Sequence, residues 1–217
     1  MKSIFNFWII KILTSLILLG VSGFALAQSR PIEEGFDYRV LPTAQALEAK
    51  GKVEVLEFFW YGCPHCHDFE PQLDAWVKRQ AKDVVVRKVP VAFRDDLLPH
   101  SQLFYALESL GKPELHAKVM DAIHVGKKKL LAEAEITDWV VSQGVNREAF
   151  TKAFRSFTVT SKARAANQIA QSYRIDGVPT VAIQGRYITS PSITGGSKAR
   201  AIDVMEHLVN KSRKEKR

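Results

Sequence analysis

Two cysteines, Cys63 and Cys66, are the only thiols in a chain of 217 residues, and they stand three positions apart within the stretch FFWYGCPHCH. Thiols at this spacing can form a redox pair, supply half of a metal site, or attach haem, since His67 completes the motif Cys-x-x-Cys-His. A zinc ion needs four ligands and would have to recruit histidines from elsewhere, yet none of these pairs with another at a typical ligand spacing: His67, His100, His116, His124 and His207. The pair is also a weak structural staple, because so short a loop constrains the unfolded chain very little.

The residues on either side of the cysteines favour the redox interpretation. The stretch VEVLEFF at 53–59 has the β-branched and aromatic composition of a buried strand. From Pro64 to about Gln80 the apolar spacing becomes helical, with a kink expected at Pro71. Haem at such a junction would displace the apolar face of the core, and two inert core cysteines would not need Pro-His between them.

A thiol in the first turn of a helix meets unpaired backbone N–H groups and the positive end of the helix dipole. Both stabilise the thiolate, so we expect the pKa of Cys63 to be lowered, with His65 adding a donor or a positive charge beside the sulfur. Cys66 lies one turn further into the helix. We therefore expect Cys66 to be the more buried thiol and to be positioned to attack a mixed disulfide at Cys63.

The remaining elements indicate the fold class. Further strands are predicted by short β-branched stretches, which lie at 36–41, 84–93, 178–183 and 186–190. Between about Leu97 and Ser172 the apolar residues recur at helical spacing, and Ser197 is placed to cap a last helix. This order predicts one α/β sheet built from residues 36–94 and 175–217, with an all-helical insertion between the two pieces.

The run from Val53 to Pro71, with Val-Pro-Thr at 178–180, resembles the thioredoxin superfamily. The Cys-Pro-His-Cys centre, the helical insertion and an apolar leader together resemble its DsbA family of periplasmic thiol:disulfide oxidants, over essentially the whole chain after the leader. The resemblance implies a thioredoxin-like α/β fold with an inserted all-helical domain. It divides the chain into a thioredoxin-like part, residues 28–94 and 175–217, and an insertion, residues 95–174, and it implies no cofactor.

The resemblance also implies roles for individual residues. Cys63 would be the exposed nucleophile and Cys66 the resolving thiol. Pro179 would be a cis-proline packed opposite the pair, and Val178 would offer its backbone to substrate peptides.

Glu57 lies on an otherwise apolar face of the first predicted strand, six residues before Cys63. A carboxylate in such a place is costly unless it is paired or protonated, and burial raises its pKa. One interpretation is an edge position that reaches water, or a bond to a lysine such as Lys88. The other, which the resemblance favours, is a proton acceptor for Cys66.

The amino terminus has the order of a secretory signal peptide: basic residues, an apolar run of 13 residues, and small residues before Ala27. A membrane anchor needs about 20 apolar residues, so we expect residues 1–27 to be removed and the protein to be exported. The resemblance implies that it is periplasmic. The formal net charge is +8, but the leader carries two lysines, and the seven residues from Lys211 carry five bases and one acid. The rest of the chain is therefore only about +2, and a frayed, solvated basic tail explains the charge better than binding to nucleic acid.

These features predict an enzyme that donates its disulfide to reduced, unfolded exported proteins. The direction follows from the stabilised Cys63 thiolate, which favours the reduced form and makes the disulfide a strong oxidant. The resemblance implies a monomer that is reoxidised by a membrane quinone reductase of the DsbB type. A disulfide isomerase or reductase on the same fold remains an alternative, as does a chaperone-like peptide binder with an incidental thiol pair.

Overall fold

The computed structural model describes residues 30–215, and all of its helices and strands belong to the unit Ile32–Arg217. The predicted signal peptide lies outside the described residues. Within them, no helix is both long enough and apolar enough to cross a membrane.

One five-stranded sheet organises the fold, in the order β1-β5-β4-β2-β3. Its strands are β1 (Arg39–Val40), β2 (Val53–Phe59), β3 (Val84–Pro90), β4 (Thr180–Ile183) and β5 (Tyr187–Thr189). The central strand β2 pairs with β3 in parallel and with β4 antiparallel. The predicted strand at 36–41 is wrong in its extent, because the chain turns before β1: the amide of Gly35 donates to Tyr38 O at 2.8 Å and that of Asp37 to Glu33 O at 2.9 Å.

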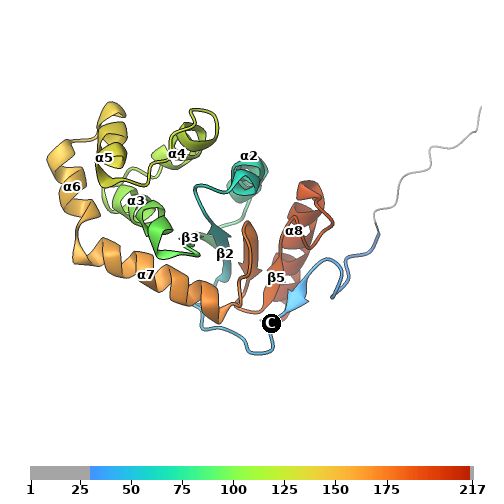
Figure 1. Cartoon of the computed structure of the whole chain (residues 1–217). Helices are drawn as coiled ribbons and strands as arrows, with labels where there is room; N and C mark the ends of the chain where they lie inside the picture. The colour runs from blue at the N-terminus through green and yellow to red at the C-terminus, as the bar shows by residue number, and fades with distance from the viewer. Residues whose placement is uncertain (1–29, 216–217) are drawn as a thin grey trace, which may run out of the picture. The chain divides into compact units, whose positions relative to one another are not determined.

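Every residue of β2 is buried because helices cover both faces of the sheet (Figure 1). On one face, α2 (Pro64–Lys78) and α8 (Lys198–Glu215) pack on Val53 and Val55. On the other face, α7 (Phe157–Ser172) packs on Leu56 and Phe58. The alternation of side chains along a strand therefore places Glu57 on the α2 face.

The helical block between β3 and β4 confirms the predicted insertion into a thioredoxin-like fold (Figure 1). Besides α7 it contains η1 (Asp95–Leu97), α3 (Leu98–Ser109), α4 (Leu115–His124), α5 (Glu133–Ser142) and α6 (Arg147–Phe154). Their apolar faces form one cluster that includes Leu103, Val119 and Phe150. Both cysteines belong to the same cluster, so the insertion packs directly against the thiol pair.

The carboxyl-terminal helix corrects one expectation. The basic tail was predicted to be frayed, but α8 continues to Glu215, with Ser197 Oγ accepting the Arg200 amide at 3.1 Å, as expected of a cap. Arg213 donates two hydrogen bonds to Asp83, at 2.7 and 2.9 Å. These contacts with a distant part of the chain order the described tail, and a local charge count could not predict them.

Candidate active site

Cys63 is the residue that caps the amino terminus of α2. Its backbone is extended (φ −87°, ψ 116°), and its carbonyl accepts the amides of Cys66 at 3.1 Å and His67 at 3.2 Å. The turn from β2 is tight at Gly62, where an added Cβ would lie 2.3 Å from the Trp60 ring. The chain therefore delivers the thiol to the helix start, as predicted.

Both thiols are free and both are buried, Cys63 at 7% exposure and Cys66 at 1%. The order of burial is the predicted one, but the expectation of an exposed Cys63 is wrong. The loop that carries Val178 approaches this sulfur, and the Cys63 thiol in its protonated form donates to Val178 O at 3.4 Å. The Val178–Pro179 peptide bond is cis, as the resemblance implied.

The pKa values of the two thiols are moved in opposite directions. Hydrogen bonding from the Cys66 thiol, with the backbone amides of Cys66 and His65 and the charge of His65, lowers the pKa of Cys63 to about 6 against the opposing effect of burial. Burial, followed by the hydrogen bond with Cys63 and the negative charge of its sulfur, raises the pKa of Cys66. Cys63 is thus a thiolate at neutral pH while Cys66 keeps its proton.

A groove of about 320 Å³ lies beside this pair. It is lined by His65, Asp68, Val178, Pro179, Pro191 and Ser192, among others. His65 is exposed and lines this groove, and its charge acts on the Cys63 sulfur. The groove therefore adjoins Cys63 through Val178, whose carbonyl oxygen lies 3.4 Å from the Cys63 sulfur.

Glu57 is 1% exposed and lies opposite Lys88 in the β2–β3 register. The Lys88 ammonium donates to Glu57 Oε2 at 2.6 Å and to Glu70 Oε1 at 2.5 Å. Burial raises the pKa of Glu57 to about 7, the charge of Lys88 lowers it, and the charge of Glu70 raises it. Glu57 in turn contributes to the raised pKa of Cys66. The bond to Lys88 is therefore the interpretation that the structure shows, and an edge position is wrong because β2 is a central strand.

The sequence analysis missed the rest of this charged cluster. Glu70 Oε1 lies 3.2 Å from His116 Nε2, and His116 Nδ1 lies 3.0 Å from the Tyr61 hydroxyl. Burial and the charge of Lys88 lower the pKa of His116 to about 3, so its ring is neutral. Only Glu70 could have been predicted from the sequence. It stands four residues after Cys66, so the spacing places this acid on the same side of the helix as the buried thiol.

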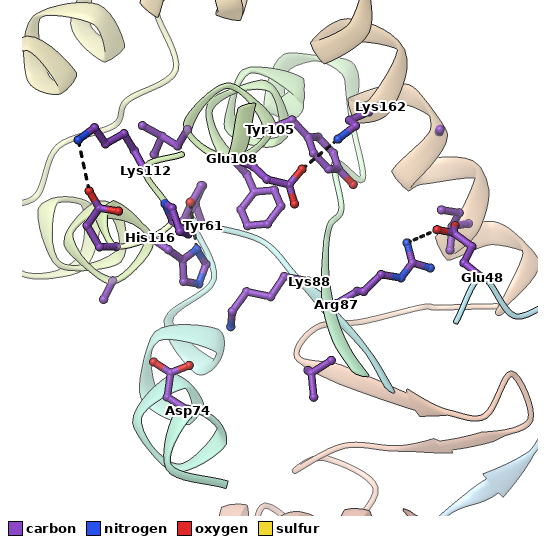
Figure 2. A pocket seen from close by; sticks show the side chains of 18 residues that line it. Glu48, Tyr61, Asp74, Arg87, Lys88, Tyr105, Glu108, Lys112, His116 and Lys162 are labelled. Carbon is purple, nitrogen blue, oxygen red and sulfur yellow. Dashed lines mark hydrogen bonds and ion pairs between the residues drawn. The ribbon is translucent and has the colours of Figure 1, made fainter. Parts of the chain in front are cut away.

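A cavity of about 730 Å³ opens beside the cluster. Figure 2 shows that Tyr61, Asp74, Lys88 and His116 line the same region of it. The side chain of Lys88 remains 22% exposed, whereas those of Glu57 and Glu70 are 1% and 6% exposed. The cluster is therefore a buried charged site with one edge at a polar cavity.

Two histidines considered as metal ligands have other partners. His67 Nε2 lies 2.9 Å from Asp121 Oδ1, and its ring stacks on that of His124 with centroids 4.9 Å apart. His124 Nε2 lies 2.8 Å from Tyr61 O. Within residues 30–215 no group of three or more His, Cys, Asp or Glu side chains is arranged to hold a metal ion.

Comparison with known proteins gives one consistent result. A family model described as Thioredoxin matches residues 48–203. The thiol:disulfide interchange protein DsbA of Burkholderia cepacia is 44% identical over 204 residues, which cover 92% of this chain and 95% of that protein. The protein of the same name from Azotobacter vinelandii is 37% identical, covering 94% and 98%. The crystal structure of Pseudomonas aeruginosa DsbA superposes with a TM-score of 0.80 at 32% identity, covering 85% of this chain and 96% of that one.

Proposed function

This chain belongs to the DsbA family of the thioredoxin superfamily, and on that premise we propose that its Cys63–Cys66 pair donates a disulfide to reduced, unfolded exported proteins. The chain is a protein thiol:disulfide oxidoreductase. The observation that carries the proposal is the lowering of the Cys63 pKa to about 6. A stabilised thiolate favours the reduced pair, so the disulfide is a strong oxidant.

In the proposed reaction, the disulfide passes to the substrate in two thiol–disulfide exchange steps. A substrate thiolate attacks the Cys63 sulfur, the bond to Cys66 breaks, and Cys66 leaves with the electron pair and takes up a proton. A second substrate thiolate then attacks the substrate sulfur of the mixed disulfide and releases Cys63 as a thiolate. The substrate loses two electrons and two protons, of which one proton stays on Cys66 and the other passes to solvent.

We assign Glu57 as the proton carrier for Cys66. A carboxyl group with a pKa of about 7 can both hold and release a proton near neutral pH. When Cys66 resolves a mixed disulfide at Cys63, Glu57 accepts the proton that the Cys66 thiol must lose. His65 stabilises the Cys63 thiolate in the same scheme.

Val178 and Pro179 form the substrate-binding edge in this proposal. The Val178 carbonyl already faces the Cys63 thiol at 3.4 Å, and both residues line the groove beside it. A substrate cysteine can therefore reach Cys63 while the neighbouring peptide backbone pairs with Val178.

Oxidation of a substrate leaves Cys63 and Cys66 reduced. The enzyme therefore interacts with substrate proteins and also with a partner that reoxidises the two cysteines. For that partner we propose a membrane quinone reductase of the DsbB type. We propose further that residues 1–27 are a signal peptide cleaved after Ala27. The mature chain would be a periplasmic monomer divided into 28–94, the insertion 95–174, and 175–217.

Trapping variants test these roles. Cys63→Ala should abolish exchange, whereas Cys66→Ala keeps the nucleophile without its resolving thiol and should accumulate mixed disulfides, which non-reducing gels from growing cells display. Equal adduct levels from both variants would mean that the two roles are wrongly assigned.

Two assays separate the alternatives. Refolding of a reduced multi-cysteine protein measures disulfide donation, and insulin reduction measures the reductase activity expected of an isomerase or reductase. A chaperone-like binder would suppress aggregation of an unfolded protein equally well with and without Cys63.

A further inference from the structure

A loop rich in lysine follows α4 and begins beside the active site. It comprises residues 125–130, and we call it the lysine loop. Lys127, Lys128 and Lys129 are exposed, as is Val125, which is 71% exposed. Leu130, at the end of the loop, is fully buried in the core of the insertion.

Contacts of the residue before the loop fix it next to the thiol pair. His124 Nε2 lies 2.8 Å from Tyr61 O, two residues before Cys63. The His124 ring also stacks on His67, the residue after Cys66. Figure 1 shows α4 next to α2, the helix that contains Cys66 and is capped by Cys63. The loop therefore begins immediately after His124, whose side chain contacts the residues on either side of the two cysteines.

The loop has a defined backbone. The amides of Gly126 and Lys128 donate to Asp121 O at 2.9 Å and Ala122 O at 3.0 Å, and His100 Nε2 lies 2.9 Å from Lys129 O. Two of its residues that are not glycine, Lys127 and Leu130, have left-handed backbones, with φ of 55° and 48°. These contacts hold the backbone of the loop in one conformation, including the two left-handed residues, which are costly unless the surroundings fix them.

Nearby acids balance only part of the positive charge of the loop. Among the described residues, no carboxylate forms an ion pair with Lys127, Lys128 or Lys129, and the Lys127 ammonium donates to His124 O at 2.6 Å. Glu133 pairs with Arg155, whereas Asp121, whose Oδ1 lies 2.9 Å from His67 Nε2, is an exposed acid beside the start of the loop. Glu135 Oε1 accepts the Lys129 amide at 3.2 Å and is the one carboxylate within residues 30–215 that is bonded to the loop.

We propose that the lysine loop binds acidic residues near the reacting cysteine of a substrate polypeptide, and so gives the enzyme a preference for cysteines with an acidic flank. The inference rests on the proposed function, since a substrate cysteine must come to Cys63. A polypeptide bound there brings its neighbouring residues within reach of the loop, and attraction between opposite charges raises the association rate. Because His124, the residue before the loop, contacts Tyr61 and His67 on either side of the thiol pair, a polypeptide that reacts at Cys63 is the favoured partner.

The test uses two dithiol peptides that are identical except for three residues after the first cysteine, which are acidic in one and glutamine in the other. Stopped-flow fluorescence gives the second-order rate of oxidation of each by the oxidised protein. We expect the acidic peptide to react roughly tenfold faster at low ionic strength. This ratio should fall towards one as added salt screens the charges.

Two loop variants and one control complete the experiment. K128Q/K129Q should bring the ratio close to one, and K128E/K129E should bring it below one. Lys127 is left in place because it bonds to the end of α4. The control K82Q/K152Q removes the same charge from exposed positions outside the loop and should keep the wild-type ratio.

The outcomes separate the two proposals. A ratio that is the same in the wild type and both loop variants overturns the role of the loop, while oxidation of the glutamine peptide still supports disulfide donation. Failure of the wild type to oxidise either peptide overturns the proposed function itself. If K128Q/K129Q loses sedimentation with phosphatidylglycerol vesicles while the peptide ratio is unchanged, the partner is a membrane surface and the peptide proposal is wrong.

Discussion

At the scale of single residues, the two thiols are suited to different parts of the exchange. The pKa of Cys63, about 6, makes it a good leaving group when a substrate disulfide forms. The raised pKa of Cys66 means that it must be protonated when it leaves and deprotonated when it attacks. Since Cys66 is 1% exposed, the proton must come from or go to a neighbouring group, and Glu57 is the candidate.

Glu57→Gln should slow the resolving step by roughly a hundredfold above pH 7, because general-base catalysis is lost. Glu57 is ionised above its pKa of about 7, so the wild-type rate should rise through that pH, and the variant should lack this rise. Stopped-flow exchange with a model peptide over a pH series measures both effects. Identical profiles would reduce Glu57 to a structural residue.

Glu70→Gln is the matched control, because Glu70 binds the same lysine. Its charge raises the pKa of Glu57, so its loss should move the rise in rate to lower pH without removing it. Glu57→Gln should not stabilise the fold, because Lys88 pairs with Glu57 at 2.6 Å and the substitution therefore removes no isolated charge.

His65→Ser should raise the pKa of Cys63 and make the disulfide less oxidising. The effect should be smaller than that of losing the Cys66 hydrogen bond, because the His65 charge is the least of the causes that lower this pKa. Thiolate ultraviolet absorbance against pH measures it, with His67→Gln as the control. An unchanged titration in His65→Ser would exclude His65 as a tuning residue.

At the scale of elements, α2 holds the thiol pair and is itself held by α8. Trp76 of α2 is 1% exposed, and its indole N–H donates to Glu206 Oε2 of α8 at 2.9 Å. Trp76→Ala should cost about 3–5 kcal/mol of unfolding free energy. Trp76→Phe should cost much less. Urea denaturation measures both, and equal stability of the alanine variant and the wild type would mean that this contact does not anchor the helix.

The elements that the sequence predicted well are those set by local pattern. β2 occupies 53–59 as expected from its β-branched and aromatic residues, and α2 starts at Pro64, where a proline suits the first turn. The elements predicted poorly depend on distant partners. β1 has two residues because a turn at 33–38 uses the backbone groups before it, and the end of α8 is ordered through Asp83.

The same distinction applies to the site. The roles predicted for Cys63 and Cys66 depend on one helix start, which the sequence contains. The cluster around Lys88 joins β2, β3, α2 and α4, and no sequence spacing brings His116 beside Glu70. The burial of Cys63 likewise depends on Val178, 115 residues further along the chain.

At the scale of the whole molecule, the lowered pKa of Cys63 links stability to pH. The reduced folded protein releases this proton near pH 6 and the unfolded chain near pH 9, so stability gained from the thiolate is complete above pH 9 and is lost as pH falls towards 6. After allowance for solvent screening, the gain is about 1–3 kcal/mol.

Reduced protein should therefore be more stable than oxidised protein at pH 8, and the difference should shrink towards pH 6. Urea denaturation of both forms across this range measures it, and the stability of reduced Cys63→Ser should rise less from pH 6 to pH 8 than that of the reduced wild type, while Glu57 and His116 titrate in both proteins. A stability difference that does not change with pH would contradict the assigned titration.

The reduction potential of the Cys63–Cys66 pair tests disulfide donation most directly, because it decides whether the enzyme oxidises or reduces its substrates. Equilibration with glutathione redox buffers, followed by measurement of the reduced fraction, gives the value. The stabilised Cys63 thiolate predicts a potential above about −200 mV, more oxidising than glutathione. A potential near the value of about −270 mV found for thioredoxin would identify a reductant and contradict disulfide donation.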